Sequence, residues 1–304
     1  MAISTINQHS IDSRHGHAML LMIAGSVAIS FGGLVQRNIE FADAWQVTFY
    51  RALGIFIVMA IFVAARHRGH VVSTVTGIGR MGLLAGALIS IAGITFVQAL
   101  TYTTIANALF ILGAIPFFAA LFARLFLGEK LRRTTMITML GAAFGLGIMV
   151  MQGVSAGSGF GNAMALITAV SFAFYAVIVR YKRKTEMLPV MLVSACIVMV
   201  ITLLVKAGDM AAPARDIILG LFWGGGLSGF VNWAFIFASR HLATAEVTLI
   251  MLLEFALGPV WVWLFIGETP SFATLLGGSL IILAVALRAI FELITKPKPE
   301  QTPS

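Results

Sequence analysis

Long apolar runs separated by short polar segments make up most of the chain. Because an α-helix rises about 1.5 Å per residue, about 20 apolar residues cross the hydrocarbon core of a bilayer. Runs of this length predict ten membrane-spanning helices: 18–36, 44–65, 80–101, 106–127, 134–152, 160–180, 188–206, 216–239, 244–266 and 271–292. The third and fourth are divided at the polar residues 101–104, because the uncharged stretch 81–123, as one helix, would be about twice as long as the hydrocarbon core is thick. The pattern therefore predicts an all-α integral membrane protein.

One of these runs occurs twice. Residues 106–130 reappear as residues 245–269, an offset of 139, with matches at Ala106 and Ala245, Ile111 and Ile250, Phe126 and Phe265, and the pairs Gly128-Glu129 and Gly267-Glu268. The copies are the fourth and ninth predicted helices, and an odd separation of five spans gives them opposite orientations in the membrane. The prediction is two inverted five-helix repeats, which are typical of secondary transporters with a substrate site near the midplane.

The repeat divides the chain into units. We expect an N-terminal tail at 1–17, a first repeat at 18–152, a linker at 153–161, a second repeat at 162–292 and a C-terminal tail at 293–304. The linker is rich in glycine and serine, which is typical of flexible connections. The N-terminal tail is short and polar, and we expect the proline-rich C-terminal tail not to pack against the helices.

The composition indicates the same environment. Hydrophobic residues make up 60% of the 304 residues and charged residues 11%, which is more apolar surface than a soluble core can bury. Sixteen of the 20 Lys and Arg residues lie on one side of the predicted spans, three lie on the other, and Arg51 lies within a span. By the positive-inside rule both termini are cytoplasmic. The net charge of +8 therefore reflects topology rather than nucleic-acid binding.

Glu254 is the strongest candidate for a functional residue. It lies midway along the ninth predicted helix, where an ionised carboxylate is costly, and the repeat places Ile115 at the equivalent position. The carboxylate could bind the ammonium group of an amino acid or an organic cation, or carry a proton in antiport. The alternative is a protonated or paired side chain that only stabilises the bundle.

Three further polar residues lie near predicted helix ends. Arg51 follows Tyr50, itself a candidate substrate contact, early in the second predicted helix. The Arg51 guanidinium could bind a carboxylate in a cavity or extend to the membrane surface. Asn107 and Glu246 match at the repeat offset and begin the fourth and ninth predicted helices. Each is a candidate substrate contact, with helix capping as the alternative.

Uncharged polar and aromatic side chains form another group of candidates. A pocket lined by amides and aromatic rings suits an aromatic solute. The candidates for such a pocket are Gln98, Tyr102, Tyr175, Asn232 and Trp233. The alternative is hydrogen bonding between helices for the amides and anchoring at the membrane interface for the rings. Three other tryptophans in predicted spans are expected to face lipid: Trp223, Trp261 and Trp263.

Pro116 and the Gly258-Pro259 pair interrupt the fourth and ninth predicted helices. Proline removes a backbone hydrogen bond, so both helices should bend. These bends are candidate gating elements, and a purely structural kink is the alternative.

Several chemistries are missing from the sequence. No set of Cys and His residues suits a metal, no glycine-rich loop carries a P-loop lysine, and Ser and His do not occur together inside the predicted spans. We therefore expect no metal, no cofactor and no enzymatic activity.

As an ordered set, these features resemble the drug/metabolite transporter superfamily, EamA type. They are the ten spans in two halves, the Gly-Glu pairs at 128–129 and 267–268, glycines about ten residues later at 141 and 277–278, and Arg51 early in the second helix. Within this family the chain most resembles bacterial exporters of aromatic amino acids and methyl viologen. The resemblance implies a basket of ten helices around a central cavity, open alternately to either side of a bacterial inner membrane. The second half departs from the symmetry, because Ser194-Ala195-Cys196 lies in the region equivalent to Arg51.

We therefore expect a monomeric inner-membrane transporter that exports aromatic or other hydrophobic amino acids by alternating access. Arg51 and Glu254 would mark the two ends of a zwitterion-sized site. The expected partners are a small-molecule substrate, the lipid bilayer and, in a coupled mechanism, protons, but not nucleic acid. The alternative within the same architecture is a proton-coupled exporter of drugs, organic cations or nucleobases. The missing catalytic groups disfavour an intramembrane enzyme, and the inverted repeat disfavours a lipid-binding scaffold.

Overall fold

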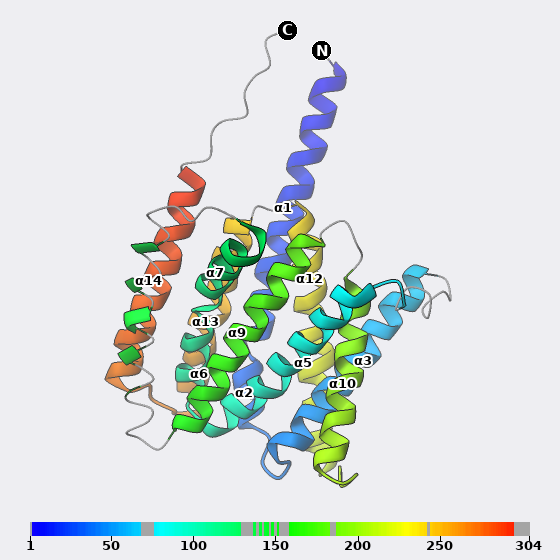
Figure 1. The fold of residues 1–304 in the computed structure, drawn as a ribbon, viewed down its shortest axis with the longest axis vertical. Coiled ribbons are helices and arrows are strands. Elements are labelled where there is room, and N and C mark those ends of the chain that lie inside the picture. The colour runs from blue at the N-terminus through cyan, green and yellow to red at the C-terminus, as the bar shows by residue number, and fades with distance from the viewer. Residues whose placement is uncertain are drawn as a thin grey trace.

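The computed structural model is a bundle of helices (Figure 1). It describes residues 2–67, 76–128, 158–182, 187–241 and 244–294, together with scattered positions between 136 and 151. Helix α1 (Ala2–Ser30) begins at the same end of the bundle at which α14 (Phe272–Ile294) ends (Figure 1). We call the opposite end the distal face; it carries residues 37–43, 206–216 and 267–271.

The helices follow the order of the predicted spans, with breaks inside three of them. After α1, the described elements of the first half are α2 (Gly32–Arg37), α3 (Ala44–His67), α5 (Gly79–Tyr102), α6 (Ile105–Leu112) and α7 (Ile115–Leu127). Those of the second half that precede α14 are α9 (Gly159–Tyr181), α10 (Leu188–Val205), α11 (Ala214–Leu221), the π-helical turn η1 (Phe222–Ser228), α12 (Gly229–His241) and α13 (Thr244–Ile266). The first span breaks at residue 31, the fourth at residues 113–114, and the eighth passes through η1.

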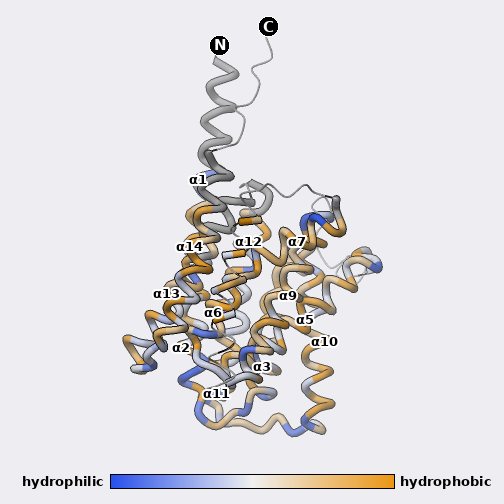
Figure 2. Tube along the Cα trace, turned by 60° about the vertical axis from the view of Figure 1, so that its left-hand side comes forward, coloured by the Kyte–Doolittle hydropathy of each residue, from blue (hydrophilic) through white to orange (hydrophobic). Residues whose placement is uncertain are grey.

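Hydropathy along these helices matches a membrane protein. Seven described segments are long and apolar enough to cross a bilayer: His15–Arg37, Ala44–Arg66, Gly79–Tyr102, Ile105–Phe126, Gly159–Tyr181, Leu188–Val205 and Ala214–Ala238. Shorter apolar helices, Leu253–Ile266 and Phe272–Ala284, occupy the ninth and tenth predicted spans. The fifth, 134–152, is described only at scattered positions. Figure 2 shows the described helices mostly apolar along their length, with hydrophilic segments near their ends.

The turn predicted between the third and fourth spans is confirmed, because α5 ends at Tyr102 and α6 begins at Ile105. Thr104 is the N-cap of α6, and its side-chain oxygen accepts a hydrogen bond from the backbone N–H of Asn107 at 3.2 Å. A threonine cap satisfies one of the free N–H groups that every helix start exposes. The polar turn therefore ends one apolar helix and starts the next.

The two halves pack against each other. In the described bundle α5 packs along α9, α3 along α10, and α13 against both α1 and α6. The face of α9 toward α5 carries the alanines Ala165, Ala169 and Ala173, which are fully buried at a spacing of four residues. Small side chains at helical spacing allow two helices to approach closely in a membrane. The interface between the halves is therefore continuous through the bundle.

The glycines of the repeated Gly-Glu pairs have one structural role in both copies. Gly128 follows α7 with φ of 69°, and Gly267 follows α13 with φ of 79°. The N–H of Gly267 donates to the carbonyl of Trp263 at 3.1 Å, which closes the last turn of α13. A left-handed residue after a helix is most often glycine, because a Cβ is strained there. The repeat thus preserves a helix end in each half.

Candidate functional site

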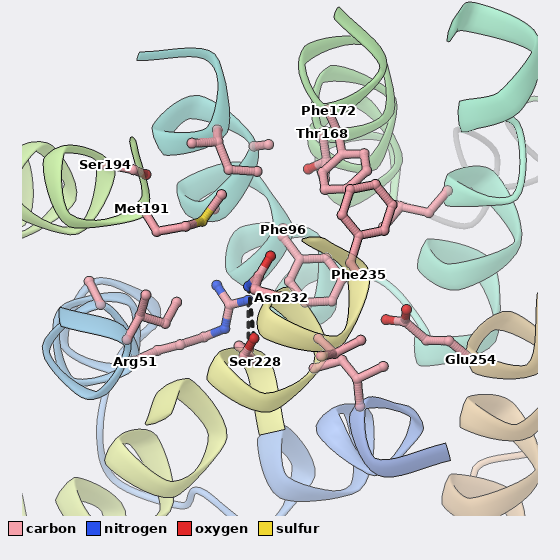
Figure 3. Close-up of a pocket in the computed structure, with 18 of the residues that line it drawn as sticks. Arg51, Phe96, Thr168, Phe172, Met191, Ser194, Ser228, Asn232, Phe235 and Glu254 are labelled. Carbon is pink, nitrogen blue, oxygen red and sulfur yellow. Dashed lines mark hydrogen bonds between the residues drawn. The ribbon is translucent and has the colours of Figure 1, made fainter. Parts of the chain in front are cut away.

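A cavity of about 160 Å³ lies inside the bundle. Residues of α1, α3, α5, α9, α10, η1, α12 and α13 line it, together with the residues on either side of the break between α6 and α7. Most of the lining side chains are apolar, and the aromatic ones are Phe96, Phe172, Phe235 and Phe255. Figure 3 shows Arg51 and Glu254 extending toward this space from opposite sides.

Arg51, on α3, faces the cavity rather than the membrane surface. Its Nη2 donates to Ser228 Oγ at 3.1 Å, and its Cζ lies 5.4 Å from the ring centroid of Phe96 and 5.0 Å from that of Trp223. Both rings are within the distance at which a cation is attracted to an aromatic face. The Arg51 Nε is buried without a hydrogen-bond partner among the described residues. The guanidinium therefore keeps donor capacity for another group.

Glu254, on α13, lies on the opposite wall, with Phe96, Asn232 and Phe235 between it and Arg51 (Figure 3). No hydrogen bond between described residues involves its carboxylate. A charged group taken out of water is costly unless an opposite charge or hydrogen bonds compensate it. The two side chains thus place a guanidinium at one end of the cavity and a carboxyl group at the other.

The repeat counterparts of both charged residues also line the cavity. Ile115, equivalent to Glu254, lies at the start of α7, and Ser194, in the region equivalent to Arg51, lies on α10. The Ser194 Oγ accepts a hydrogen bond from Ser90 Oγ at 3.0 Å. Each half therefore contributes one charged and one uncharged residue at related positions, and the charges have opposite sign.

Of the uncharged candidates, Asn232 lines the cavity, and its Nδ2 donates to the backbone carbonyl of Ser228 at 2.7 Å. Tyr50 points toward the distal face, where its hydroxyl donates to the carbonyl of Met210 at 2.5 Å. Gln98 is buried in α5 outside the cavity lining. Tyr102 is 53% exposed and packs edge-on against Phe160.

Three more candidates lie outside the cavity lining. The Asn107 Nδ2 donates to Thr103 Oγ1 at 3.2 Å and also bonds Asn162 Oδ1 on α9. Tyr175 is buried on α9 beside Phe172, and Trp233 stacks on Phe62 of α3. The Asn107 and Trp233 contacts join helices, whereas Phe172 lies on the same helix as Tyr175. None of the three residues is part of the cavity lining.

The remaining predicted residues belong to α13 and to the start of α7. The side chain of Glu246 lies outside the described residues, although its backbone is in α13. Pro116 occupies the first turn of α7, directly after the break at residues 113–114, where proline needs no N–H partner. Pro259 lies inside α13, and a Cβ on the preceding Gly258 would collide with the Leu109 side chain of α6.

Several residues at the site were not predicted. Phe96, Phe172, Phe235 and Ser228 line the cavity, and Trp223 packs on Arg51. Trp223 was expected to face lipid, but it is fully buried. The run of three glycines directly after it, residues 224–226, is the sequence signal that marks a close helix contact there.

Trp261 and Trp263 have different environments from each other. The Trp261 indole N–H donates to Ser30 Oγ at 2.9 Å, and its ring stacks on Phe31 at 4.9 Å. This tryptophan therefore contacts the first half of the protein instead of facing lipid only. Trp263 is 52% exposed, as the expectation of a lipid-facing residue requires.

Ionic contacts join the two halves at the distal face. Arg37 Nε lies 2.7 Å from Glu268 Oε2, and Lys206 Nζ lies 2.7 Å from Asp43 Oδ2. The Asp216 carboxylate accepts the backbone N–H groups of residues 41 and 42 at 2.8 Å each. The loop after α2 is thereby attached to the end of α10 and to the first turn of α11.

Metal binding has no support in the described part of the chain, where no three His, Cys, Asp or Glu residues group together in a way that could hold an ion. One guanidinium, one carboxylate and one amide are available around a mainly aromatic and aliphatic space. Such a pocket orients an apolar ligand through a few polar groups.

Comparison with known proteins agrees with this architecture. The pseudopaline exporter CntI of Pseudomonas aeruginosa, found in two strains, is 24% identical over 271 residues, which cover 88% of this chain and 93% of the relative. A crystal structure with 17% sequence identity superposes with a TM-score of 0.66 and covers 92% of this chain and 99% of the other, which shows a shared fold. The EamA-like transporter family matches twice, at residues 16–151 and 159–289. The chain therefore belongs to the EamA-like transporter family, whose members are ten-helix membrane transporters built from two repeats.

Proposed function

We propose that the protein exports aromatic or other hydrophobic amino acids across the bacterial inner membrane by alternating access. The observation that carries this proposal is that Arg51 and Glu254, from different halves, face one aromatic-lined cavity. An amino acid has a carboxylate for the guanidinium and an ammonium group for the carboxylate, and charge-assisted hydrogen bonds are the strong ones. Its side chain would lie among Phe96, Phe172 and Phe235, where ring contacts add to apolar burial.

The cavity size supports a small substrate. A dry cavity of about 150 Å³ accommodates a benzene ring, whereas pockets for drug-sized ligands measure about 300–1,000 Å³. The cavity of about 160 Å³ lies at the lower end of this scale. One aromatic ring with a short zwitterionic group therefore suits it better than a multi-ring drug.

Orientation and organisation complete the proposal. Export is the direction named for the Pseudomonas aeruginosa relative. The distribution of Lys and Arg supports cytoplasmic termini, which makes the distal face periplasmic. We place the repeats at 18–152 and 162–292, joined by the linker 153–161, and take a monomer as the working unit. The ionic contacts between halves at the distal face support one closed side of an alternating cycle.

Flux of labelled phenylalanine and tryptophan into proteoliposomes tests this function. Wild-type protein should carry both above the rate of protein-free vesicles. Arg51→Gln should reduce the flux at least about tenfold, since a lost hydrogen bond to a charged group costs about 1.5–3 kcal/mol. The flux of Arg51→Lys should lie between those of the wild type and Arg51→Gln, because an ammonium group keeps the charge but lacks the paired donors. Wild-type flux no greater than that of empty vesicles would overturn the proposal.

A second function, proton-coupled export of organic cations, is favoured by one observation. The Glu254 carboxylate faces the cavity without a hydrogen-bond partner among the described residues. A carboxylate in that position can exchange a proton for a cation. The same vesicles with labelled methyl viologen and an imposed pH gradient separate the two functions, since only the second predicts gradient-driven flux of a dication without a carboxylate.

A further inference from the structure

The cavity arginine is held by one short segment of the second half, the π-helical turn η1. A free arginine side chain has many rotamers, so a guanidinium that must meet a substrate carboxylate in one geometry needs support. Ser228 is the last residue of η1, and its Oγ accepts a hydrogen bond from the Arg51 Nη2 at 3.1 Å. Trp223 is the second residue of η1, and its ring centroid lies 5.0 Å from the Arg51 Cζ. Two contacts to one side chain therefore come from residues five positions apart.

The π-helical geometry explains how both residues reach the same guanidinium. In an α-helix, residues five apart differ by about 140° in direction at 3.6 residues per turn. The wider π-helical turn, with its hydrogen bonds from residue i to i+5, brings such residues much closer to one face. Trp223 and Ser228 can thus both face α3. Turns of this kind are rare and occur frequently at functional sites.

Glycines fix the distance between η1 and the backbone of Arg51. A Cβ on Gly224 would collide with the Arg51 carbonyl oxygen, and a Cβ on Gly225 would lie 3.0 Å from the Gly54 carbonyl oxygen. The two backbones are therefore in direct contact, with no side chain between them. Because backbone atoms cannot move aside as a flexible side chain can, this contact sets where the Arg51 side chain begins.

The Trp223 ring is itself immobilised. It is fully buried, and a Cβ on Gly32 of α2 would lie 2.6 Å from its Nε1. Phe96 of α5 lies 5.4 Å from the Arg51 Cζ and 6.0 Å, centroid to centroid, from Trp223. The guanidinium thus has aromatic neighbours from both halves, and it lines the cavity beside them.

We propose that Trp223 is a positioning residue for substrate recognition: with Ser228 and Phe96 it holds the Arg51 guanidinium so that its free donors meet the carboxylate of a zwitterionic ligand. This inference rests on the proposed function. It makes η1 the element that gives preference for ligands with a carboxylate over the corresponding amines. Trp223 acts through Arg51 and contacts no substrate.

The experiment is a double-mutant cycle on phenylalanine binding by the full-length purified protein. Trp223→Leu should weaken binding about tenfold, in line with a desolvated cation–π contact. On an Arg51→Gln background the same substitution should change binding less than about twofold, because the group it positions is gone. Trp223→Phe should restore most of the affinity, since a ring face is retained. Trp263→Leu, a half-exposed tryptophan away from the cavity, is the matched control and should bind as the wild type does.

A second ligand separates positioning from folding. Phenethylamine keeps the ring and ammonium group of phenylalanine but lacks the carboxylate. Trp223→Leu should therefore leave the affinity for phenethylamine, measured by competition, unchanged. If Trp223→Leu does not fold, Ser228→Ala replaces it in the cycle. We then expect a smaller loss of phenylalanine affinity, which again disappears on the Arg51→Gln background. Equal losses on both Arg51 backgrounds would overturn the inference and leave the proposed function standing. Failure of the wild type to bind phenylalanine would overturn both.

Discussion

Arg37 Nε donates to Glu268 Oε2 at 2.7 Å, and this contact attaches the repeated Gly-Glu pair of the second half to the first half. The other nitrogens of the same guanidinium donate to the carbonyls of Leu100 at 2.7 Å and Thr103 at 2.9 Å. Glu268 Oε1 in turn accepts the backbone N–H of Ile105 at 2.7 Å. One carboxylate therefore caps α6 while its arginine partner satisfies carbonyls near the end of α5. A negative side chain is stabilising at the start of a helix.

Glu268→Gln should lower the free energy of unfolding by about 1–2 kcal/mol, because a charged hydrogen bond is replaced by a neutral one. The side chains of Arg37 and Glu268 are only 23% and 20% exposed, so solvent screens them less than it screens a surface pair. Thermal unfolding of the purified protein measures the change. Glu40→Gln breaks the exposed Arg215–Glu40 pair, at 57% and 53% exposure, and should cost less than about 0.5 kcal/mol. Equal shifts for the two variants would contradict the capping role.

Glu254→Gln should remove the negative charge that we propose binds the substrate's ammonium group. We expect phenylalanine flux to fall at least about tenfold, since the amide cannot form a charge-assisted bond with the ammonium group. Ile115→Leu, at the repeat-equivalent position on the same cavity, changes shape without charge and should retain flux within a few-fold. Flux is measured in proteoliposomes with and without an imposed pH gradient. If Glu254→Gln leaves both the flux and its pH dependence unchanged, the carboxylate has no part in transport.

Asp43 and Lys206 give the distal face a pH-dependent contact. Burial raises the pKa of Asp43, but hydrogen bonds from Lys206 and from two backbone N–H groups outweigh it and place the pKa below the ordinary 3.8. The hydrogen bond to Asp43 raises the pKa of Lys206 above its ordinary 10.5. The Asp43 contribution to stability is therefore present above pH 3.8 and lost as the pH falls through the lowered pKa. The Lys206 contribution is present below 10.5 and lost as the pH rises through the raised pKa.

Asp43→Asn should accordingly lower the melting temperature at pH 7 and have a progressively smaller effect as the pH falls below 3.8. Lys206→Met should reproduce the effect at pH 7, because it removes the same pair from the other side. Thermal unfolding at a series of pH values checks both variants. A melting-temperature difference for Asp43→Asn that is the same at pH 7 and pH 3 would show that the ion pair does not stabilise the fold.

The positions of the helices could be predicted from the sequence because apolar length limits where a span can lie. The polar residues at 101–104 gave the turn between α5 and α6, since a helix turn in a membrane needs hydrogen-bonding groups. The breaks in the first and eighth spans were not predicted. Residue 31 lies in a run that no charged residue interrupts, and η1 differs from an α-helix only in its hydrogen-bond ladder.

Of the residues that line the cavity, the sequence could identify only those whose placement inside a membrane costs free energy. Arg51 and Glu254 stood out because a charge inside an apolar run needs a compensating environment. Gln98 and Tyr102, by contrast, share a helix with Phe96, and only Phe96 faces the cavity. The rotation of a helix about its axis is set by packing against its neighbours, which a single sequence does not contain. The same limit applies to Trp223, because a tryptophan in an apolar run is compatible with lipid or with a core.

Gly224 supplies the sharpest test of the contact between α3 and η1. A Cβ at this position meets the backbone carbonyl of Arg51, which cannot rotate away, so Gly224→Ala must separate the two helices. We expect a loss of about 3 kcal/mol in the free energy of unfolding, as for other overpacked sites, together with weaker phenylalanine binding because Arg51 moves with its backbone. Gly16→Ala, in α1 with no described atom within 4 Å of the added Cβ, should gain about 0.5–1 kcal/mol from helix propensity. If Gly224→Ala is as stable as Gly16→Ala, the two backbones are not in contact and η1 does not set the position of Arg51.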